Sequence, residues 1–304
     1  MRLPDSGHEP VLLDEVVRLL DPRPGQVFVD CTVGRAGHSS AIAARLGESG
    51  VLIGLDADPR NLQFAKERLQ KMPCEVRLFH ANFAELDDVL TEARAPLVDG
   101  ILADLGISTN QLFDQSYGLS FAQPMPLDMR LDPRISTTAA DLVNTMREED
   151  LADVLFELAQ ERYSRRIARK IAEARRQAPI TSTERLAELV RSAIPSRRGP
   201  PEKIDPATRT FMALRMAVND ELGNLDALLR RAPRHLKPGG RFGVISFHSG
   251  EDRRIKQAFR SAEQTAEPSG HVSIITKKPL SPTDQELTRN PRARSAKLRV
   301  IEKV

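Results

Sequence analysis

Short apolar runs alternate with amphipathic stretches along the first third of the chain. The apolar runs have the length and β-branched content of buried strands, and they cover residues 27–31, 51–55, 76–80 and 100–103. The stretches between them have the 3.6-residue periodicity of helices, and they cover residues 41–47, 60–71 and 84–94. Strands that alternate with helices in this way favour a parallel sheet with helices on both faces.

The same alternation returns at the end of the chain. Residues 241–247 predict a strand that ends in the letters SFHS, residues 251–262 predict a helix, and residues 296–302 alternate like a last strand. These elements belong with the first ones, because they continue the same β-α-β pattern.

The middle of the chain has a different pattern. From about residue 135 to residue 206 it is helical and polar, and the proline-rich segment 194–208 is typical of a return linker. We therefore predict an α/β fold with a doubly wound, mostly parallel, Rossmann-like sheet. Residues 1–112 and 207–304 form this sheet domain, and residues 113–206 form an inserted helical domain.

Polar residues follow four of the predicted strands, at the edge where open α/β sheets bind ligands. They are Asp30, with the glycine turn at Gly34 and Gly37, then Asp56, the segment HANF (80–83), which ends in Phe83, and Asp104. Asp56 could accept the ribose hydroxyls of a nucleoside or could cap the next helix, and Phe83 could pack on a purine. The full glycine fingerprint of dinucleotide sites is missing. The pattern therefore favours a nucleoside cofactor without a pyrophosphate, with S-adenosylmethionine as the leading candidate.

Composition narrows the classes of function. The chain has 45 basic and 42 acidic residues, so a nucleic-acid surface would need local clusters of charge. Cys31 and Cys74 form no metal-ligand pattern and are typical of reduced thiols. No apolar run approaches the length of a membrane span. We expect a cytoplasmic protein that needs neither metal nor membrane.

Basic residues cluster in two places. Segment 160–176 predicts a helix that carries Arg162, Arg165, Arg166 and Arg169 on one face and Tyr163, Ile167 and Ile171 on another. The carboxyl-terminal segment adds Arg289, Arg292, Arg294, Lys297 and Arg299, and the linker adds Arg197 and Arg198. Such clusters suit contacts with RNA phosphates, although a solvated helix face has the same pattern.

Seven longer motifs together resemble one family, the MraW family of bacterial 16S ribosomal RNA cytosine-N4 methyltransferases. The motifs run nearly from end to end: HEPVLLDEV (8–16), DCTVGRAGHS (30–39), DLGISTNQL (104–112), PLDMRLD (126–132), PATRTFMALRMAVNDEL (206–222), ISFHSGEDR (245–253) and NPRARSAKLRV (290–300). The resemblance implies an S-adenosylmethionine-dependent enzyme that methylates a cytidine near the P site of the small ribosomal subunit.

The resemblance also implies the cofactor contacts. They are Ala36, Gly37, His38, Asp56, Phe83, Asp104 and Gln111. The chain departs from the family pattern twice. Ala36 replaces a common glycine, which is tolerable if its φ is negative. Gly250 replaces a usual leucine, which leaves open how tightly the following helix packs.

The chemistry requires a hydrogen-bond acceptor for the cytosine amine, because positive charge develops on its nitrogen during methyl transfer. Asp104 is our first candidate, and Asp128 and His248 are the alternatives. His248 could instead hydrogen-bond its own turn, and Asp128, with Arg130, could merely fix a loop. Cys31 is better interpreted as a buried structural thiol than as a nucleophile for C5 methylation.

Two other functions remain open from the residues alone. One is a nicotinamide-dependent oxidoreductase on the same α/β plan, which the incomplete glycine fingerprint disfavours. The other is a non-catalytic RNA-binding assembly factor that keeps a vestigial pocket. Titration with S-adenosylmethionine and NADH distinguishes the first alternative, and mass spectrometry of incubated RNA distinguishes the second.

Overall fold

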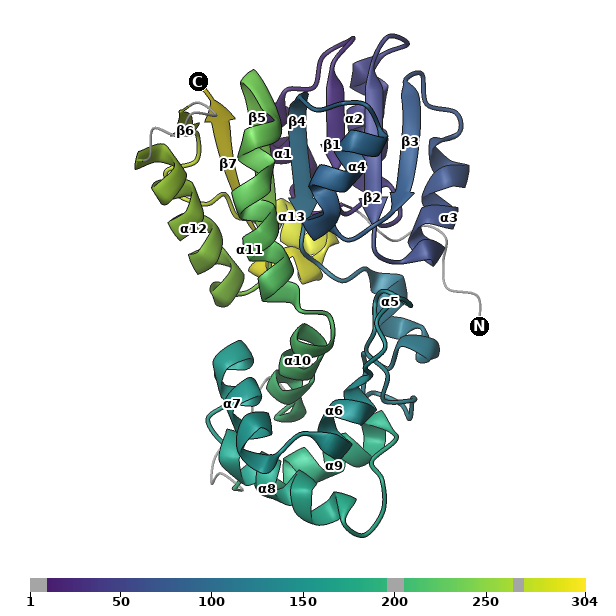
Figure 1. The fold of residues 1–304 in the computed structure, drawn as a ribbon, viewed down its shortest axis with the longest axis vertical. Coiled ribbons are helices and arrows are strands. Elements are labelled where there is room, and N and C mark those ends of the chain that lie inside the picture. Colours follow the sequence, from purple (N-terminus) through teal and green to yellow (C-terminus); the bar gives the residue numbers. More distant parts are fainter. Residues whose placement is uncertain (1–9, 196–204, 265–270) are drawn as a thin grey trace. The chain divides into compact units, whose positions relative to one another are not determined.

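The structure is a computed structural model that describes residues 10–195, 205–264 and 271–304. The chain divides into two compact units (Figure 1). Unit 1 comprises residues 1–106 and 222–304, and unit 2 comprises residues 107–221. The chain therefore leaves the first unit once and returns to it once.

Unit 1 contains a seven-stranded sheet with the order β3-β2-β1-β4-β5-β7-β6. The strands are β1 (Val27–Asp30), β2 (Val51–Asp56), β3 (Glu75–His80), β4 (Val98–Asp104), β5 (Leu236–Ser246), β6 (Val272–Ile274) and β7 (Lys297–Lys303). Neighbours from β3 to β5 pair in parallel, whereas β7 runs antiparallel to both β5 and β6. The order reverses at β1, so the carboxyl ends of β1, β2 and β4 meet at a topological switch point. The predicted doubly wound, mostly parallel sheet is confirmed.

Helices cover both faces of this sheet because successive strand residues point to opposite sides. Phe28 packs toward one face and the next residue, Val29, toward the other. The first face is covered by α1 (Leu13–Leu20), α2 (Gly37–Leu46) and α3 (Pro59–Leu69). The second is covered by α4 (Leu86–Glu92), α11 (Glu221–Arg231) and α12 (Ser249–Gln264). Shorter elements complete the unit: the 3₁₀ helices η1 (Phe83–Glu85), η3 (Ala232–His235) and η4 (Pro291–Ser295), and helix α13 (Asp284–Arg289).

Unit 2 is helical and has its own apolar core. Its elements are α5 (Thr109–Phe113), η2 (Gln115–Tyr117), α6 (Ala139–Thr145), α7 (Glu148–Ala159), α8 (Ser164–Arg175), α9 (Thr183–Ala193) and α10 (Ala207–Val218). Leu155, Ile167 and Ile171 are fully buried in this core. Helices α6 and α7 are separate, because the chain turns into an extended conformation at Met146 and Arg147.

The unit boundaries differ from the predicted domain boundaries. Helix α10 was placed in the sheet domain, yet it packs against α6, α7 and α9. Its buried residues, such as Phe211 and Leu214, belong to the core of unit 2. The return to the sheet therefore follows Glu221. Most of the predicted linker, residues 194–208, lies outside the described residues.

No helix within the described residues combines the length and the apolar character that crossing a bilayer requires.

Candidate active site

The turn between β1 and α2 closes tightly. The Val33 N–H donates to the carbonyl of Leu55, and the Ala36 N–H donates to the carbonyl of Val33. Gly34 has a φ of +52°, and Ala36 has a φ of +59°. Ala36 therefore does not meet the condition of a negative φ under which alanine would be tolerated here. A left-handed backbone costs an L-residue about 1–2 kcal/mol relative to glycine, so this alanine is strained.

Asp56 holds the glycine turn to the end of β2. Its Oδ2 accepts the N–H of Gly34 at 2.7 Å, and its Oδ1 accepts the N–H of Asp58 at 2.9 Å. The amide of Asn61 lies 3.4 Å from both oxygens. Burial raises the pKa of Asp56 to about 6, although these hydrogen bonds oppose the rise.

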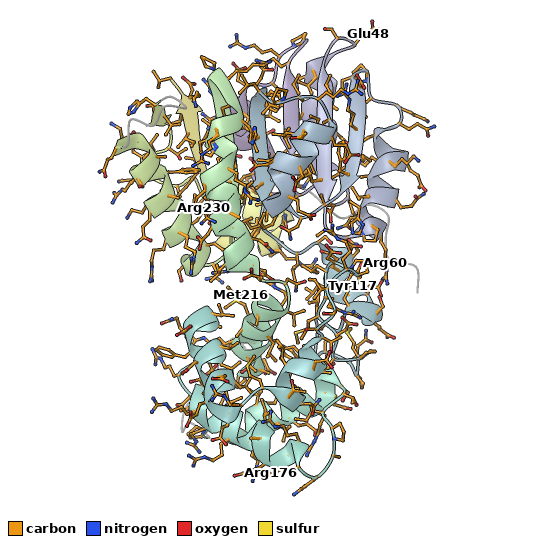
Figure 2. All side chains as sticks on the ribbon, viewed as in Figure 1. Glu48, Arg60, Tyr117, Arg176, Met216 and Arg230 are labelled. Carbon is orange, nitrogen blue, oxygen red and sulfur yellow. The ribbon has the colours of Figure 1, made fainter. Side chains whose placement is uncertain are left out.

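Asp58, and not Asp56, caps α3. Its carboxylate accepts the N–H of Arg60 at 2.9 Å. The interpretation of Asp56 as a helix cap is therefore wrong. A carboxylate has about four lone-pair sites, so Asp56 keeps acceptor capacity beyond its two short backbone bonds. In Figure 2, the label at Arg60 marks this carboxyl-terminal edge of the sheet, and Glu48 marks the opposite edge.

Phe83 opens η1, directly after the end of β3. The side chains of Asn82 and Glu85 fix this short helix with a capping box. Phe83 is half-buried against the core under α4. Part of the ring is therefore exposed near the third strand end, where the sequence placed an aromatic contact.

Asp104 ends β4 beside the glycine turn. Its backbone N–H donates to Oγ1 of Thr32 at 2.7 Å, and its Oδ2 lies 3.7 Å from Nδ1 of His38. One fifth of its side chain is exposed. Burial raises the pKa of Asp104 to about 6; the charge of His38 opposes the rise, and the carboxylates of Asp30 and Glu251 add to it. A carboxyl group with such a pKa is suited to exchanging protons near neutral pH.

Glu251 is a residue that the sequence analysis did not single out. Its side chain is buried, and its Oε2 accepts the N–H groups of Phe247 and His248 at 2.8 and 3.2 Å. Its Oε1 lies 3.1 Å from Nε2 of His248, but not in hydrogen-bond geometry. Glu251 therefore fixes the turn after β5 that carries His248. Glu251 lies three residues after His248, which follows a predicted strand. This spacing could have pointed to Glu251 in the sequence.

Gly250 leaves room for the His248 ring. A Cβ atom at this position would lie 3.1 Å from Nδ1 of His248, closer than most real contacts. Helix α12 nevertheless packs firmly, since Ile255 and Phe259 are buried in the core. The missing leucine thus affects the surroundings of His248 more than the packing of the helix.

Gln111 and Asp128 lie in unit 2. Oε1 of Gln111 accepts both the N–H and the hydroxyl of Ser108, which caps α5. Both oxygens of Asp128 accept from Arg130, at 2.7 and 2.8 Å. Burial raises the pKa of Asp128, but the hydrogen bonds and charge of Arg130 outweigh burial and hold it below its usual value. The catalytic role of Asp128 and the cofactor contact of Gln111 stay predictions.

The basic residues of the two clusters differ in how far they are exposed. Arg165, Arg166 and Arg169 are exposed on α8, and the label at Arg176 marks its end in Figure 2. The prediction that Arg162 shares their helical face is wrong, because α8 begins only at Ser164. Arg162 precedes it in a turn and is also exposed.

In the carboxyl-terminal segment, Arg292 and Arg294 are exposed on η4. Arg299 is not available for phosphate contacts, since it is buried and pairs with Asp252 at 2.8 Å. Lys297 pairs with the same carboxylate at 3.2 Å. The linker residues Arg197 and Arg198 lie outside the described residues.

Cys31 does not have the surroundings of a nucleophile. It is buried at the end of β1, and burial, followed by the charge of Asp30, raises the pKa of its thiol well above the usual value. The thiolate form is therefore disfavoured. Among the residues that the structure describes, no group of three His, Cys, Asp or Glu side chains could hold a metal ion.

The comparisons with known proteins agree over the whole chain. Residues 5–304 match the model of the MraW methylase family. A protein of Acidobacterium capsulatum named ribosomal RNA small subunit methyltransferase H is 46% identical, over 97% of this chain and 98% of its own length. Proteins with the same name are 46% identical in Syntrophotalea carbinolica, over 98% of each chain, and 45% identical in Geobacter sulfurreducens, over 98% of this chain and 99% of its own length.

Proposed function

Because this chain belongs to the MraW methylase family of S-adenosylmethionine-dependent methyltransferases, we propose that it methylates N4 of a cytidine in the P-site region of 16S ribosomal RNA. The relatives named ribosomal RNA small subunit methyltransferase H support an RNA substrate in the small ribosomal subunit. The proposed place of action is the cytoplasm.

One observation carries the proposal. The glycine turn, Asp56 and Asp104 stand at neighbouring strand ends, and two of the three supply carboxyl groups whose pKa is about 6. The carboxylate of Asp56 is suited to binding the hydroxyls of a nucleoside, and that of Asp104 is suited to accepting a proton. A nucleoside site and an acid–base group at one switch point are what methyl transfer to an amine requires.

The residues of this edge fit S-adenosylmethionine. Asp56 has acceptor capacity left for ribose hydroxyls, and the partly buried side chain of Phe83 can pack on the adenine. The N–H groups of Gly37 and His38 lie in the first turn of α2, where a helix has no acceptor of its own and favours a carboxylate. When bound, S-adenosylmethionine supplies a methyl group on a positively charged sulfur. We propose that Asp104 and Gln111 complete this set.

The protein's part in the chemistry is to position the amine and to accept its proton. The lone pair of the cytosine amine is conjugated with the ring and is a poor nucleophile. An acceptor on an amine N–H stabilises the positive charge that develops on nitrogen. Asp104 is our first candidate for this acceptor, since its carboxyl group is partly exposed at the edge of the sheet. Asp128 has both oxygens engaged by Arg130, and His248 is fixed by Glu251.

We propose that the helical unit and the exposed arginines bind the RNA. Arg162, Arg165, Arg166 and Arg169 would contact phosphates from unit 2, and Arg292 and Arg294 from unit 1. With aromatic residues at only 4% of the chain, charge and shape should contribute more to recognition than base stacking.

Mass spectrometry of ribosomal RNA tests the proposal. RNA from a strain that lacks the gene, and small subunits from that strain incubated with the purified protein and S-adenosylmethionine, would be digested and mapped. We expect one cytidine to be unmethylated at N4 in the deletion strain and to gain a single methyl group on incubation. Methylation of another base or atom would refute the specificity. Absence of any methyl transfer, with intact RNA binding, would favour an assembly factor.

A further inference from the structure

The side chain of His38 is almost completely buried at the start of α2, with 8% of it exposed. Its Nε2 lies 2.8 Å from the backbone carbonyl oxygen of Val11. A carbonyl oxygen can only accept a hydrogen bond, so Nε2 must carry the hydrogen. The neutral imidazole ring then has its lone pair on Nδ1.

Nδ1 of His38 lies 3.7 Å from Oδ2 of Asp104, the proposed proton acceptor. A lone pair and a carboxylate repel one another at this separation, unless a proton lies on one of them. The two side chains therefore form a natural site for a single proton, which the pair shares as imidazolium and carboxylate or as imidazole and carboxylic acid.

The groups around this pair favour the added positive charge. Asp30, at the end of β1, and Glu251, on α12, both act on Asp104 electrostatically. Asp30 also interacts with His38 and accepts a hydrogen bond from Ser39. Oε1 of Glu251 also lies 3.1 Å from Nε2 of His248. Among the described residues, the carboxyl groups of Asp104 and Asp30 both act on the His38 ring, and the Val11 carbonyl oxygen is its hydrogen-bond partner.

We propose that His38 is the proton-accepting partner of Asp104 in the methyl transfer. This inference rests on the proposed function. As the amine nitrogen forms its bond to the methyl carbon, the carbon–sulfur bond breaks and its electron pair goes to sulfur. The amine proton passes to Oδ2 of Asp104. From there it passes to Nδ1 of His38 once the 3.7 Å between these atoms shortens to hydrogen-bond distance, while Nε2–H stays on the Val11 carbonyl. Asp104 is thereby returned to its charged form without opening the site to water.

The titration of Asp104 tests the pairing without RNA or cofactor. The signal of its side-chain carboxyl carbon would be followed by ¹³C NMR in aspartate-labelled protein, with Asp104→Asn for assignment. In His38→Gln the side-chain amide can still donate to the Val11 carbonyl, but the ring charge is lost. We expect the midpoint to rise by about one pH unit, because the imidazolium no longer stabilises the carboxylate.

His235 provides a matched control. Its Nδ1 bonds the carbonyl of Pro96 at 2.9 Å and its Nε2 lies 2.7 Å from Asp87, so it also joins a carbonyl to a carboxylate. It precedes β5, away from the carboxyl ends of the strands. His235→Gln should leave the titration of Asp104 unchanged. An unchanged midpoint in His38→Gln as well would overturn the pairing.

The wild-type protein offers a second test, which does not depend on how the variants fold. Nitrogen-15 spectra of the histidine rings report which nitrogen carries the hydrogen. We expect the Nε2–H form for His38, and the Nδ1–H form would overturn the proposal.

Kinetics separate this inference from the proposed function. His38→Gln should slow single-turnover methylation by about tenfold or more at saturating cofactor, the low end for a proton-transfer group. Its affinity for S-adenosylmethionine should stay within about twofold, since only the ring is changed. A wild-type rate would refute the catalytic part. If instead the wild-type enzyme modified no cytosine N4 while the NMR coupling persisted, the proposed function alone would fail.

Discussion

The carboxylate of Asp56 accepts the N–H of Gly34 at 2.7 Å and so joins the end of β2 to the turn that follows β1. These residues are 22 positions apart in the chain, yet they form one surface. Removing the carboxylate should therefore affect both the turn and the ligand that it faces.

We predict that Asp56→Ala weakens S-adenosylmethionine binding by roughly 1.5–3 kcal/mol, the scale of charge-assisted hydrogen bonds. Isothermal titration calorimetry measures the change. Asp58→Ala is the control, since it removes the cap of α3 and should lower stability more than affinity. Wild-type affinity in a folded Asp56→Ala protein would exclude Asp56 from the cofactor site.

Cofactor affinity should also depend on pH through the same group. The pKa of Asp56 is about 6, so its carboxylate is present above pH 6 and is lost as the pH falls. If binding needs the carboxylate, the dissociation constant should rise roughly tenfold between pH 7.5 and pH 5. Asp56→Asn should flatten this dependence, and an equally steep curve in that variant would assign the titration to another group.

Asp104→Asn should make the protein slower but more stable. We expect the single-turnover rate at saturating cofactor to fall by about 10²-fold or more, as for a lost proton acceptor. A wild-type rate under these conditions would limit Asp104 to cofactor binding.

The gain in stability follows from the sign of the shift. The folded-state pKa of Asp104 is raised from 3.8 to about 6, so the folded protein holds a proton that the unfolded chain has released over this range. Stability therefore falls as the pH rises from about 4 to 6. Removing the charge should raise the free energy of unfolding at pH 7.5 by about 1–3 kcal/mol.

Asp99→Asn, on the same strand β4, is the control for the gain in stability expected of Asp104→Asn. Asp99 accepts the N–H of Val27 and pairs with Lys237, so this variant should lose stability. Urea unfolding of both variants measures the difference, and a destabilised Asp104→Asn protein would contradict the argument.

Because Ala36 is strained, replacing it with glycine should cost less stability than replacing an alanine inside a helix. Ala43→Gly, in the middle of α2, should destabilise the protein by about 1 kcal/mol or more, since glycine disfavours helix interiors. Ala36→Gly instead relieves a left-handed alanine, so it should be more favourable than Ala43→Gly by about 1–2 kcal/mol. Equal losses in thermal unfolding would show that Ala36 carries no strain.

The exposed arginines of α8 should determine the salt dependence of RNA binding. Changing Arg165 and Arg166 to Gln should reduce the slope of log affinity against log salt by about one for each lost phosphate contact. Cofactor affinity should not change. Arg185→Gln on α9, whose side chain pairs with Glu188, is the control. An unchanged slope in the double variant would identify this face of α8 as merely solvated.

The sequence predicted the sheet and the strand ends well, because each depends on a local pattern. Asp56 and Asp104 could be placed since a buried strand stops where its apolar run stops. Contacts between distant segments do not follow from local patterns, so the sequence did not predict them. The pairing of Arg299 with Asp252 needs β7 to lie beside α12, and the start of α8 after Arg162 depends on a turn that periodicity does not report. The φ of Ala36 follows from how the whole turn closes.

The pairing of β4 with β5 has a consequence for how the chain folds during its synthesis. The two strands are hydrogen-bonded in parallel, although β4 ends at Asp104 and β5 begins only at Leu236. Lengthening a loop adds only about 0.6 kcal/mol for each doubling, so the insertion affects equilibrium stability little. The insertion has a larger effect on when β4 and β5 can pair. A nascent chain must emerge with the edge of β4 unpaired until all of unit 2 has been made, and such edges invite aggregation. Helices fold quickly from local contacts, so a helical insertion shortens the interval during which that edge is exposed.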